Sequence, residues 1–244
     1  MSEILGQTPM YIEYFNRPFE KRKKMANTAV VLGATGLVGS ALVNQLRKDE
    51  FFSHIRLLVR RRVEVEDTKI EQLVLDFDDE MALEQGIKGA SAVFCVVGTT
   101  LRKTGGDMEA YRKVDVAIPV AAARACKKWD IPSFLLVTSV GADAGSSNYY
   151  LRFKGEAEAA VRAEGIPCTH IFRPSMLLGN RQESRPAEYL GRVLMPIVSF
   201  LIPENYKPIR DREVARAMLY YAKNPKEGFF IHHYRDMRAV GLLK

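Results

Sequence analysis

The sequence predicts an α/β fold in which a parallel sheet is covered by helices on both faces. Short apolar segments without polar alternation are separated by segments whose apolar residues recur at helical spacing. A strand that is apolar on both sides is typical of a parallel sheet, because helices bury both of its faces. The chain has 244 residues, 47% of them hydrophobic, which suits one large domain with a buried core.

The elements are expected in alternation along the chain. The apolar residues of the first helix, for example, share one face: Leu37, Val38, Ala41, Leu42 and Leu46. We expect strands at residues 28–32, 55–59, 73–75, 92–97, 134–137 and 169–172. We expect helices at residues 37–48, 78–86, 108–128 and 149–164. Beyond Leu178 the pattern weakens into loop and helix, so we expect the substrate-side elements mainly from residues 178–244.

Residues 1–27 differ from residues 28–244, which we expect to form a single domain. This N-terminal extension holds several aromatic residues and the basic run Lys21-Arg22-Lys23-Lys24, and Pro9 and Pro18 interrupt any long helix. One interpretation is a loosely docked extension. The alternative is a segment that lies on an anionic membrane surface or on a protein partner.

Charge and cysteine content restrict the partners and the compartment. The formal net charge of +7 favours anionic small molecules, and recognised nucleic-acid-binding motifs are absent, so no nucleic-acid partner is expected. Cys95, Cys126 and Cys168 lie in separate apolar runs, which indicates a reducing compartment. Without a signal-peptide pattern, this predicts a cytoplasmic protein, with peripheral membrane contact through residues 1–27 as the alternative.

A glycine-rich turn joins the first predicted strand to the first helix. Gly33, Gly36 and Gly39 give the pattern GxxGxxG, with Ala34, Thr35, Leu37 and Val38 between them. The first glycine permits the tight turn, the second lets a pyrophosphate approach the backbone, and the third lets the helix pack closely on the sheet. The free N–H groups of the helix N-terminus then face the phosphates. The turn therefore predicts a dinucleotide site on a Rossmann-type doubly wound sheet with a small C-terminal substrate lobe.

The residues after the second strand favour NADP(H) as the cofactor. A site for NAD has an acidic residue there, whereas this chain has Arg60 and Arg61, whose guanidinium groups suit a 2′-phosphate. Asp76 and Phe77 follow the third strand and are expected to meet the adenine, although Asp76 could equally be a helix N-cap. Gly98-Thr99 follows the fourth strand and is expected near the ribose and nicotinamide.

A phenol and an ammonium group share one face of a later predicted helix. Tyr150 and Lys154 are four residues apart, and the preceding strand ends in Thr138-Ser139. An ammonium group favours the ionised phenol, so such a pair can exchange a proton with a carbonyl or carbinol oxygen. A hydroxyl at the strand end can hold that oxygen. Ser139, Tyr150 and Lys154 are therefore the candidate catalytic residues.

These motifs together resemble the short-chain dehydrogenases/reductases of the extended or atypical type. The chain is most similar to the Tat-interacting oxidoreductase-like family. The resemblance covers about residues 28–225 and is carried by the stretches at 33–39, 97–100, 137–143, 150–156, 172–174 and 181–186.

The resemblance implies NADPH binding and a Ser139, Tyr150 and Lys154 triad. Lys154 and Tyr150 would then also contact the cofactor, and Arg173 and Pro174, after the sixth strand, would line the nicotinamide side. Many relatives have an asparagine in the long helix that helps to relay protons, and its counterpart here is Asp115.

Three functions are consistent with these motifs. The first is an NADPH-dependent carbonyl reductase or alcohol dehydrogenase that acts on a small carbonyl or alcohol substrate. The second is an NADPH-binding regulatory or protein-interaction factor with little turnover. The third is an epimerase or dehydratase, which uses the same residues with a retained cofactor. The charged cluster Arg181, Glu183, Arg185 and Glu188 is either part of a substrate gate or a surface ion-pair network. We interpret His170, His232, His233 and Trp129 as structural.

Overall fold

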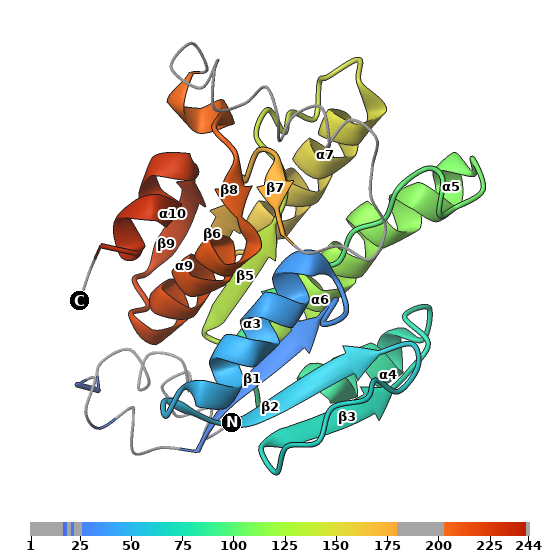
Figure 1. Cartoon of the computed structure of the whole chain (residues 1–244). Coiled ribbons are helices and arrows are strands. Elements are labelled where there is room, and N and C mark those ends of the chain that lie inside the picture. The colour runs from blue at the N-terminus through green and yellow to red at the C-terminus, as the bar shows by residue number, and fades with distance from the viewer. Residues whose placement is uncertain (1–16, 19–20, 22–25, 180–202, 243–244) are drawn as a thin grey trace, which may run out of the picture.

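The computed structural model describes residues 17–18, 21, 26–179 and 203–242 (Figure 1). Within these residues seven strands form one parallel sheet in the order β3-β2-β1-β4-β5-β6-β9. Its strands are β1 (Asn27–Leu32), β2 (Phe52–Val59), β3 (Ile70–Val74), β4 (Ala92–Cys95), β5 (Ser133–Val137), β6 (Cys168–Phe172) and β9 (Gly228–His232). The predicted parallel α/β sheet is confirmed. The aromatic residues and the basic run expected in the N-terminal extension lie almost entirely outside the described residues.

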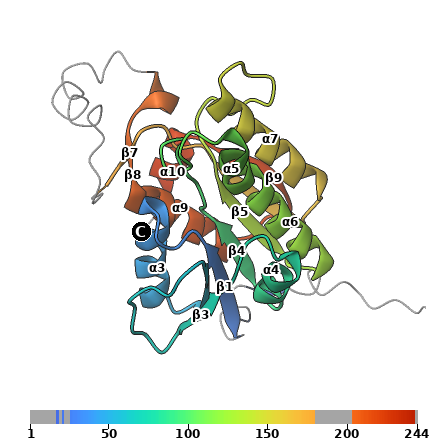
Figure 2. The ribbon, with the colours of Figure 1, turned by 90° about the vertical axis from the view of Figure 1, so that its right-hand side faces the viewer.

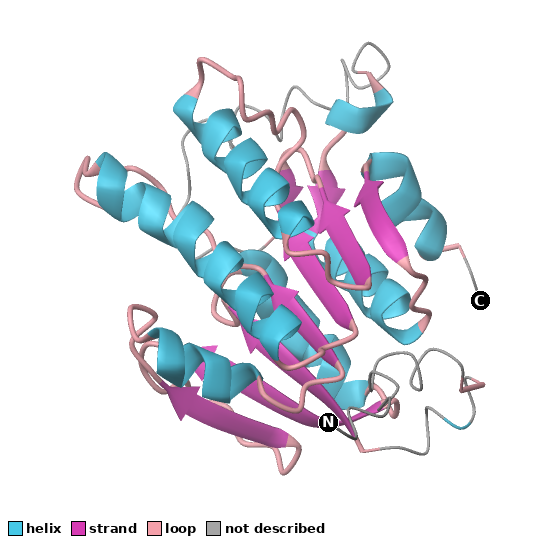
Figure 3. Ribbon diagram, turned by 180° about the vertical axis from the view of Figure 1, so that it is seen from behind, coloured by secondary structure: helices cyan, strands magenta, loops and turns pink. Residues whose placement is uncertain are grey.

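Helices cover both faces of this sheet (Figures 2 and 3). One layer consists of α3 (Leu37–Lys48), α9 (Asp211–Lys223) and α10 (Tyr234–Val240). The opposite layer consists of α4 (Glu80–Ile87), α5 (Met108–Arg112), α6 (Ile118–Lys128) and α7 (Tyr149–Ala163). No helix in the described part of the chain is long and apolar enough to cross a membrane.

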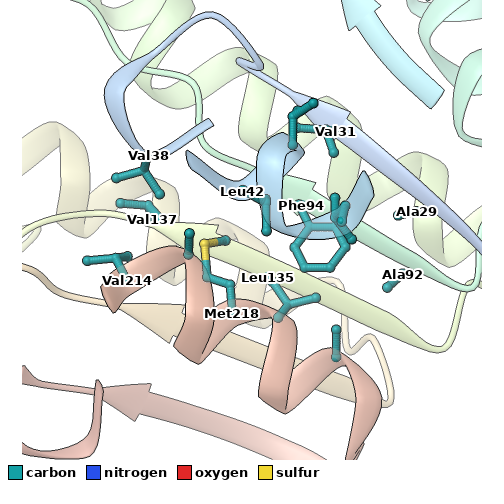
Figure 4. Packing of buried hydrophobic residues seen from close by; sticks show 14 of the residues in the cluster. Ala29, Val31, Val38, Leu42, Ala92, Phe94, Leu135, Val137, Val214 and Met218 are labelled. Atoms are coloured by element: carbon teal, nitrogen blue, oxygen red, sulfur yellow. The ribbon is translucent and has the colours of Figure 1, made fainter. Parts of the chain in front are cut away.

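The two helix layers explain why the strands lack polar alternation. Val31 of β1 packs in the core under α3 and α9, beside Leu42 and Met218 (Figure 4). The next residue, Leu32, points to the other core, which α4, α6 and α7 cover. Each β1 residue from Ala29 onward is therefore buried whichever way it points.

The end of the chain differs from the expected loop and helix. β9 pairs with β6 as a seventh parallel strand, and α9 packs against α3. The sequence gives no signal for β9, because a segment of five residues is too short to show a periodicity. Its phenylalanines are only partly buried at the edge of the sheet. A second, two-stranded sheet joins β7 (Leu177–Leu178) to β8 (Ile209–Arg210), and a short helix, η2 (Glu204–Tyr206), precedes β8.

The long helix predicted at residues 108–128 contains a π-helical turn. α5 leads into this turn, η1 (Lys113–Ala117), which leads into α6. The N–H of Ile118 donates to the carbonyl of Lys113, five residues back. Pro119 has no N–H to donate to the carbonyl of Asp115, and its ring would crowd that carbonyl in a regular α-helix. The wider turn accommodates the proline and includes Asp115.

Candidate cofactor and catalytic site

The glycine turn after β1 has the geometry that a dinucleotide site requires. Gly33 has a φ of +88°, and a Cβ there would lie 2.7 Å from the backbone of Val96. A Cβ on Gly39 would lie 2.1 Å from the carbonyl oxygen of Gly33, so only glycine allows α3 to approach the turn this closely. The tight turn at Gly33 and the close approach at Gly39 are the roles that the sequence pattern predicted for these two glycines.

The N-terminus of α3 is suited to a phosphate. Gly36 is the N-cap residue, no side chain caps the helix, and its first turn carries no acidic residue. The free N–H groups and the positive end of the helix dipole therefore remain available to an anion. A Cβ on Gly36 would come within 3.3 Å of the Gly33 carbonyl oxygen, so a side chain there would crowd this cradle. These residues fit the pyrophosphate of a dinucleotide.

Arg60 and Arg61 follow β2, the strand next to β1, and both are exposed. Neither makes a hydrogen bond or ion pair with any residue that the structure describes. Because β1 and β2 are parallel neighbours, the arginines lie at the same sheet edge as the glycine turn. They are available to an anionic group at this edge.

Two other predicted cofactor positions have local structural roles. Asp76 Oδ1 accepts a hydrogen bond from the N–H of Asp78 at 3.0 Å. The N-cap of α4 is Asp79, so the interpretation of Asp76 as a helix cap is wrong. Phe77 is partly buried against the core under α4. Gly98 and Thr99 follow β4 as expected, at the centre of the carboxyl edge.

The candidate catalytic residues come from β5 and α7. Ser139 follows β5 and is buried, and its hydroxyl donates to the Val140 carbonyl at 3.3 Å. Tyr150 lies in the first turn of α7, which Asn148 caps, and it is 37% exposed. Lys154 is buried one turn later. The Tyr150 ring is therefore open to solvent, whereas most of the Lys154 side chain is covered by protein.

Lys154 forms an ion pair that the sequence did not predict. Its Nζ lies 2.9 Å from Oδ2 of Asp115, and the two side chains are only 8% and 1% exposed. The other oxygen of Asp115 accepts a hydrogen bond from the Thr99 N–H at 2.9 Å. Asp115 thus joins the loop after β4 to α7.

The phenol of Tyr111 is buried next to this ion pair. Burial raises the pKa of Tyr111 above its usual value, and the nearby Asp115 carboxylate and Tyr150 raise it further. Burial likewise raises the pKa of the Cys95 thiol to about 12, so Cys95 stays protonated beside Lys154. Tyr111 could have been found in the sequence because it precedes Asp115 by one helical turn.

Arg173 is held by a glutamate of α7. Its guanidinium group contacts the Glu158 carboxylate at 2.5 Å and 3.0 Å, and the Thr138 hydroxyl donates to the same carboxylate. This leaves Ser139, rather than Thr138, as the strand-end hydroxyl for a substrate. Contact of Arg173 with a cofactor stays a prediction. Pro174 lies beside the loop that follows Ser139, since its carbonyl accepts from the Val140 N–H at 2.9 Å.

The signal that could have revealed Glu158 is its spacing from the catalytic pair. Tyr150, Lys154 and Glu158 follow one another at intervals of four residues on α7.

The charged cluster of Arg181, Glu183, Arg185 and Glu188 lies outside the described residues.

Comparisons with known proteins show a family that binds NAD(P)H. Residues 33–225 match a family model described as NAD(P)H-binding. Protein HTATIP2 of Rattus norvegicus is 37% identical over 173 residues, which are 69% of this chain and 71% of the relative. Protein FMP52, mitochondrial, of Debaryomyces hansenii is 32% identical over 205 residues, which are 81% of this chain and 88% of the relative.

Solved structures show the same fold at low identity. MoeE5 in complex with UDP-glucose and NAD matches with a TM-score of 0.65 and 17% identity, over 89% of this chain and 82% of that one. The Bordetella bronchiseptica enzyme WbmH in complex with NAD+ matches with a TM-score of 0.67 and 15% identity, over 86% and 76% of the two chains.

The relatives correct one expectation and identify the family. The FMP52 proteins of several fungi are named mitochondrial, which contradicts the cytoplasmic location that we expected from the cysteines. Buried, unpaired cysteines indicate only a reducing environment, and they do not distinguish compartments that share it. The match over residues 33–225 and the identity with HTATIP2 and FMP52 show that this chain belongs to the NAD(P)H-binding family that includes these proteins.

Proposed function

We propose that this protein is an NADPH-dependent oxidoreductase that transfers hydride to or from a small carbonyl or alcohol substrate. The observation that carries the proposal is the arrangement on α7, where the half-exposed Tyr150 precedes the buried Lys154 by one turn. This arrangement lies at the same edge of the sheet as the glycine turn. In this proposal Tyr150 is the proton donor for a carbonyl oxygen, at the edge of the sheet where the dinucleotide binds.

Each part of the site has a separate task in this proposal. The N-terminus of α3 binds the pyrophosphate, and Arg60 and Arg61 bind the 2′-phosphate. NADPH supplies the hydride when it is bound. Ser139 orients the substrate carbonyl, and the Tyr150 hydroxyl gives its proton to the carbonyl oxygen. The Lys154 ammonium group, one helical turn after Tyr150, holds the ribose.

The first test replaces the proton donor. Tyr150→Phe is expected to lower kcat/KM at least about 100-fold, because general acid catalysis contributes rate accelerations of this order. The dissociation constant of NADPH should stay unchanged, since the ring is kept. The measurement is NADPH oxidation across a panel of small aldehydes and ketones, with titration calorimetry for binding.

Tyr149→Phe is the matched control for this test. Tyr149 precedes Tyr150 on α7, and its ring packs against Tyr111 and Phe153. Removing its hydroxyl keeps this packing and should leave turnover near the wild-type value. Full activity of Tyr150→Phe would refute the catalytic assignment. Tight NADPH binding without turnover of any carbonyl by the wild type would favour the regulatory function instead.

The second test concerns the cofactor. Arg60→Ala combined with Arg61→Ala should weaken NADPH binding by about 10- to 100-fold, the loss expected for charged hydrogen bonds to a phosphate. NADH lacks the 2′-phosphate, so its affinity should change much less. Arg62→Ala removes a neighbouring exposed arginine and is the control. Equal losses for the two cofactors would show that these arginines do not select NADPH.

A further inference from the structure

A polar groove of about 600 Å³ lies between α3 and α9. The two helices run side by side on one face of the sheet (Figure 1), and the Gln45 amide of α3 donates to the Arg212 carbonyl of α9 at 2.9 Å. Three cations line the groove: Lys48 of α3, and Arg212 and Arg216 of α9. None of the described residues that line it belongs to the candidate cofactor and catalytic site, so the groove is a separate feature of the molecule.

The three cations of this groove carry charge that the described residues do not neutralise. Lys48, Arg212 and Arg216 make no ion pair and no side-chain hydrogen bond with any residue in the described part of the chain. The carboxylates that neighbour them in the sequence bind other cations, in the pairs Asp49–Lys223 and Glu213–Arg238. The positive charge of the groove is therefore available to a ligand.

Asp211 is the one carboxylate among the described residues that line the groove. It lies at the start of α9, and its Oδ1 accepts the N–H of Arg212 at 2.6 Å. This single negative charge leaves the groove with an excess of positive charge, and a concave surface concentrates the resulting potential. The groove therefore attracts an anion.

The side chains of the groove suit a phosphate group on a polar molecule. Arg212 and Arg216 lie one helical turn apart on α9, and each planar guanidinium group can donate two parallel hydrogen bonds to phosphate oxygens. The Asn44 amide makes no hydrogen bond with a described residue and can bind hydroxyl groups of the same molecule. The volume of the groove is in the usual range for a small-molecule site.

The same lining disfavours larger anionic partners. Ala41 is the one apolar residue among the described residues of the groove, so little apolar surface is available to enter a membrane or to anchor a protein partner. These residues also include no aromatic side chain on which a nucleic-acid base could stack. A small, polar anion therefore fits the groove best.

We infer that the groove between α3 and α9 binds a small organic phosphate, a phosphomonoester that also carries hydroxyl groups, through Lys48, Arg212 and Arg216. This site is additional to the dinucleotide site at the glycine turn. It goes beyond the function proposed above and does not depend on it, because it requires neither hydride transfer nor any residue of α7.

Titration calorimetry of the full chain tests the inference with ribose 5-phosphate as the probe. Saturating NADPH is present throughout, so that the N-terminus of α3 is occupied and does not bind the added phosphate. Ribose 5-phosphate should bind with a dissociation constant in the micromolar to millimolar range. Ribose, which lacks the phosphate, should give no heat of binding.

Arg212→Gln and Arg216→Gln should each weaken the binding of ribose 5-phosphate at least about 10-fold, a loss typical of charged hydrogen bonds to a phosphate. Both side chains are exposed, so the variants should fold as the wild type does. Arg162→Gln is the matched control, since it makes the same charge change at an exposed position of α7, in the opposite helix layer, and should leave the affinity unchanged. Asp211→Asn should strengthen binding, because it removes a negative charge from the groove.

Two results would overturn the inference. One is the absence of ribose 5-phosphate binding in the millimolar range, and the other is an affinity that neither arginine variant changes. Cosedimentation with vesicles that contain phosphatidylserine tests a membrane as the partner. Vesicle binding that Arg216→Gln abolishes, without binding of ribose 5-phosphate, would assign the groove to a membrane surface instead. Failure of the proposed function would leave all these results unaffected, because none of them requires turnover.

Discussion

Gly155 lies one residue after Lys154 on α7, against the loop that follows Ser139. A Cβ at Gly155 would lie 2.1 Å from the backbone nitrogen of Ala144 and 2.3 Å from the carbonyl carbon of Asp143. The N–H of Asp143 also donates to the Leu151 carbonyl at 3.1 Å, which ties the loop to the helix. The absence of a side chain at this position therefore sets how closely the loop after Ser139 and α7 approach each other.

Gly155→Ala is expected to destabilise the fold by about 3 kcal/mol, the upper part of the usual range for overpacking, because the atoms it meets belong to the backbone. Turnover should also fall, since the loop that carries Ser139 must move away from α7. Urea unfolding and steady-state kinetics measure the two effects. Gly145→Ala is the control, because its Cβ would meet no atom closer than 3.6 Å. Equal stabilities of the two variants would contradict this account.

At the scale of the elements, apolar periodicity correctly predicts the long helix but not the local deviation from α-helical geometry within it. The apolar spacing from residue 108 to residue 128 indicates a helix, and the structure contains one. A π-helical turn directly before Pro119 accommodates the proline, and this turn includes Asp115. The carboxylate reaches Lys154 from this turn, so a deviation from regular helix lies at the candidate catalytic site.

Two buried histidines join β6, β9 and α9. The Nδ1 of His170 and the Nε2 of His232 are 2.7 Å apart across the strand pair. The ring of Tyr221, from α9, stacks on His232 with its centroid 4.0 Å away. The Sγ of Cys168 lies 3.2 Å from the remaining ring nitrogen of His170. This packing agrees with the interpretation of both histidines as structural.

For the whole molecule, these histidines predict a loss of stability in acid. Burial lowers the pKa of His170 to about 3 and that of His232 to about 4. Free histidine titrates near pH 6.5, so below that pH the unfolded chain binds more protons than the folded one. Their contribution to stability is therefore complete above about pH 6.5 and is lost as the pH falls toward 4 and 3.

The free energy of unfolding should fall by up to about 1.4 kcal/mol per pH unit for each histidine in this range. Urea unfolding at pH 7, 6 and 5 measures the slope, which should be smaller when His170 and His232 are both replaced by phenylalanine. His54→Gln is the control, because His54 is exposed. If the double variant has the same slope as the wild type, groups other than these histidines cause the loss of stability in acid.

The sequence by itself determined the parallel α/β fold, the glycine turn, the arginines after β2 and the spacing of Tyr150 and Lys154. These features are local: they depend on periodicity, on backbone freedom at single glycines and on residues one helical turn apart. A reader of the sequence can therefore place the candidate cofactor and catalytic residues on their elements.

Only the tertiary structure decided which charged groups meet. Asp115 pairs with Lys154, 39 positions further along the chain, and Arg173 pairs with Glu158 across the β6–α7 connection. It also decided that residues 228–232 complete the sheet as β9. Such contacts depend on strand order, helix packing and the π-helical turn, and no short sequence window contains this information. The physical reason is that partners distant in the chain are chosen by the packing of the whole fold.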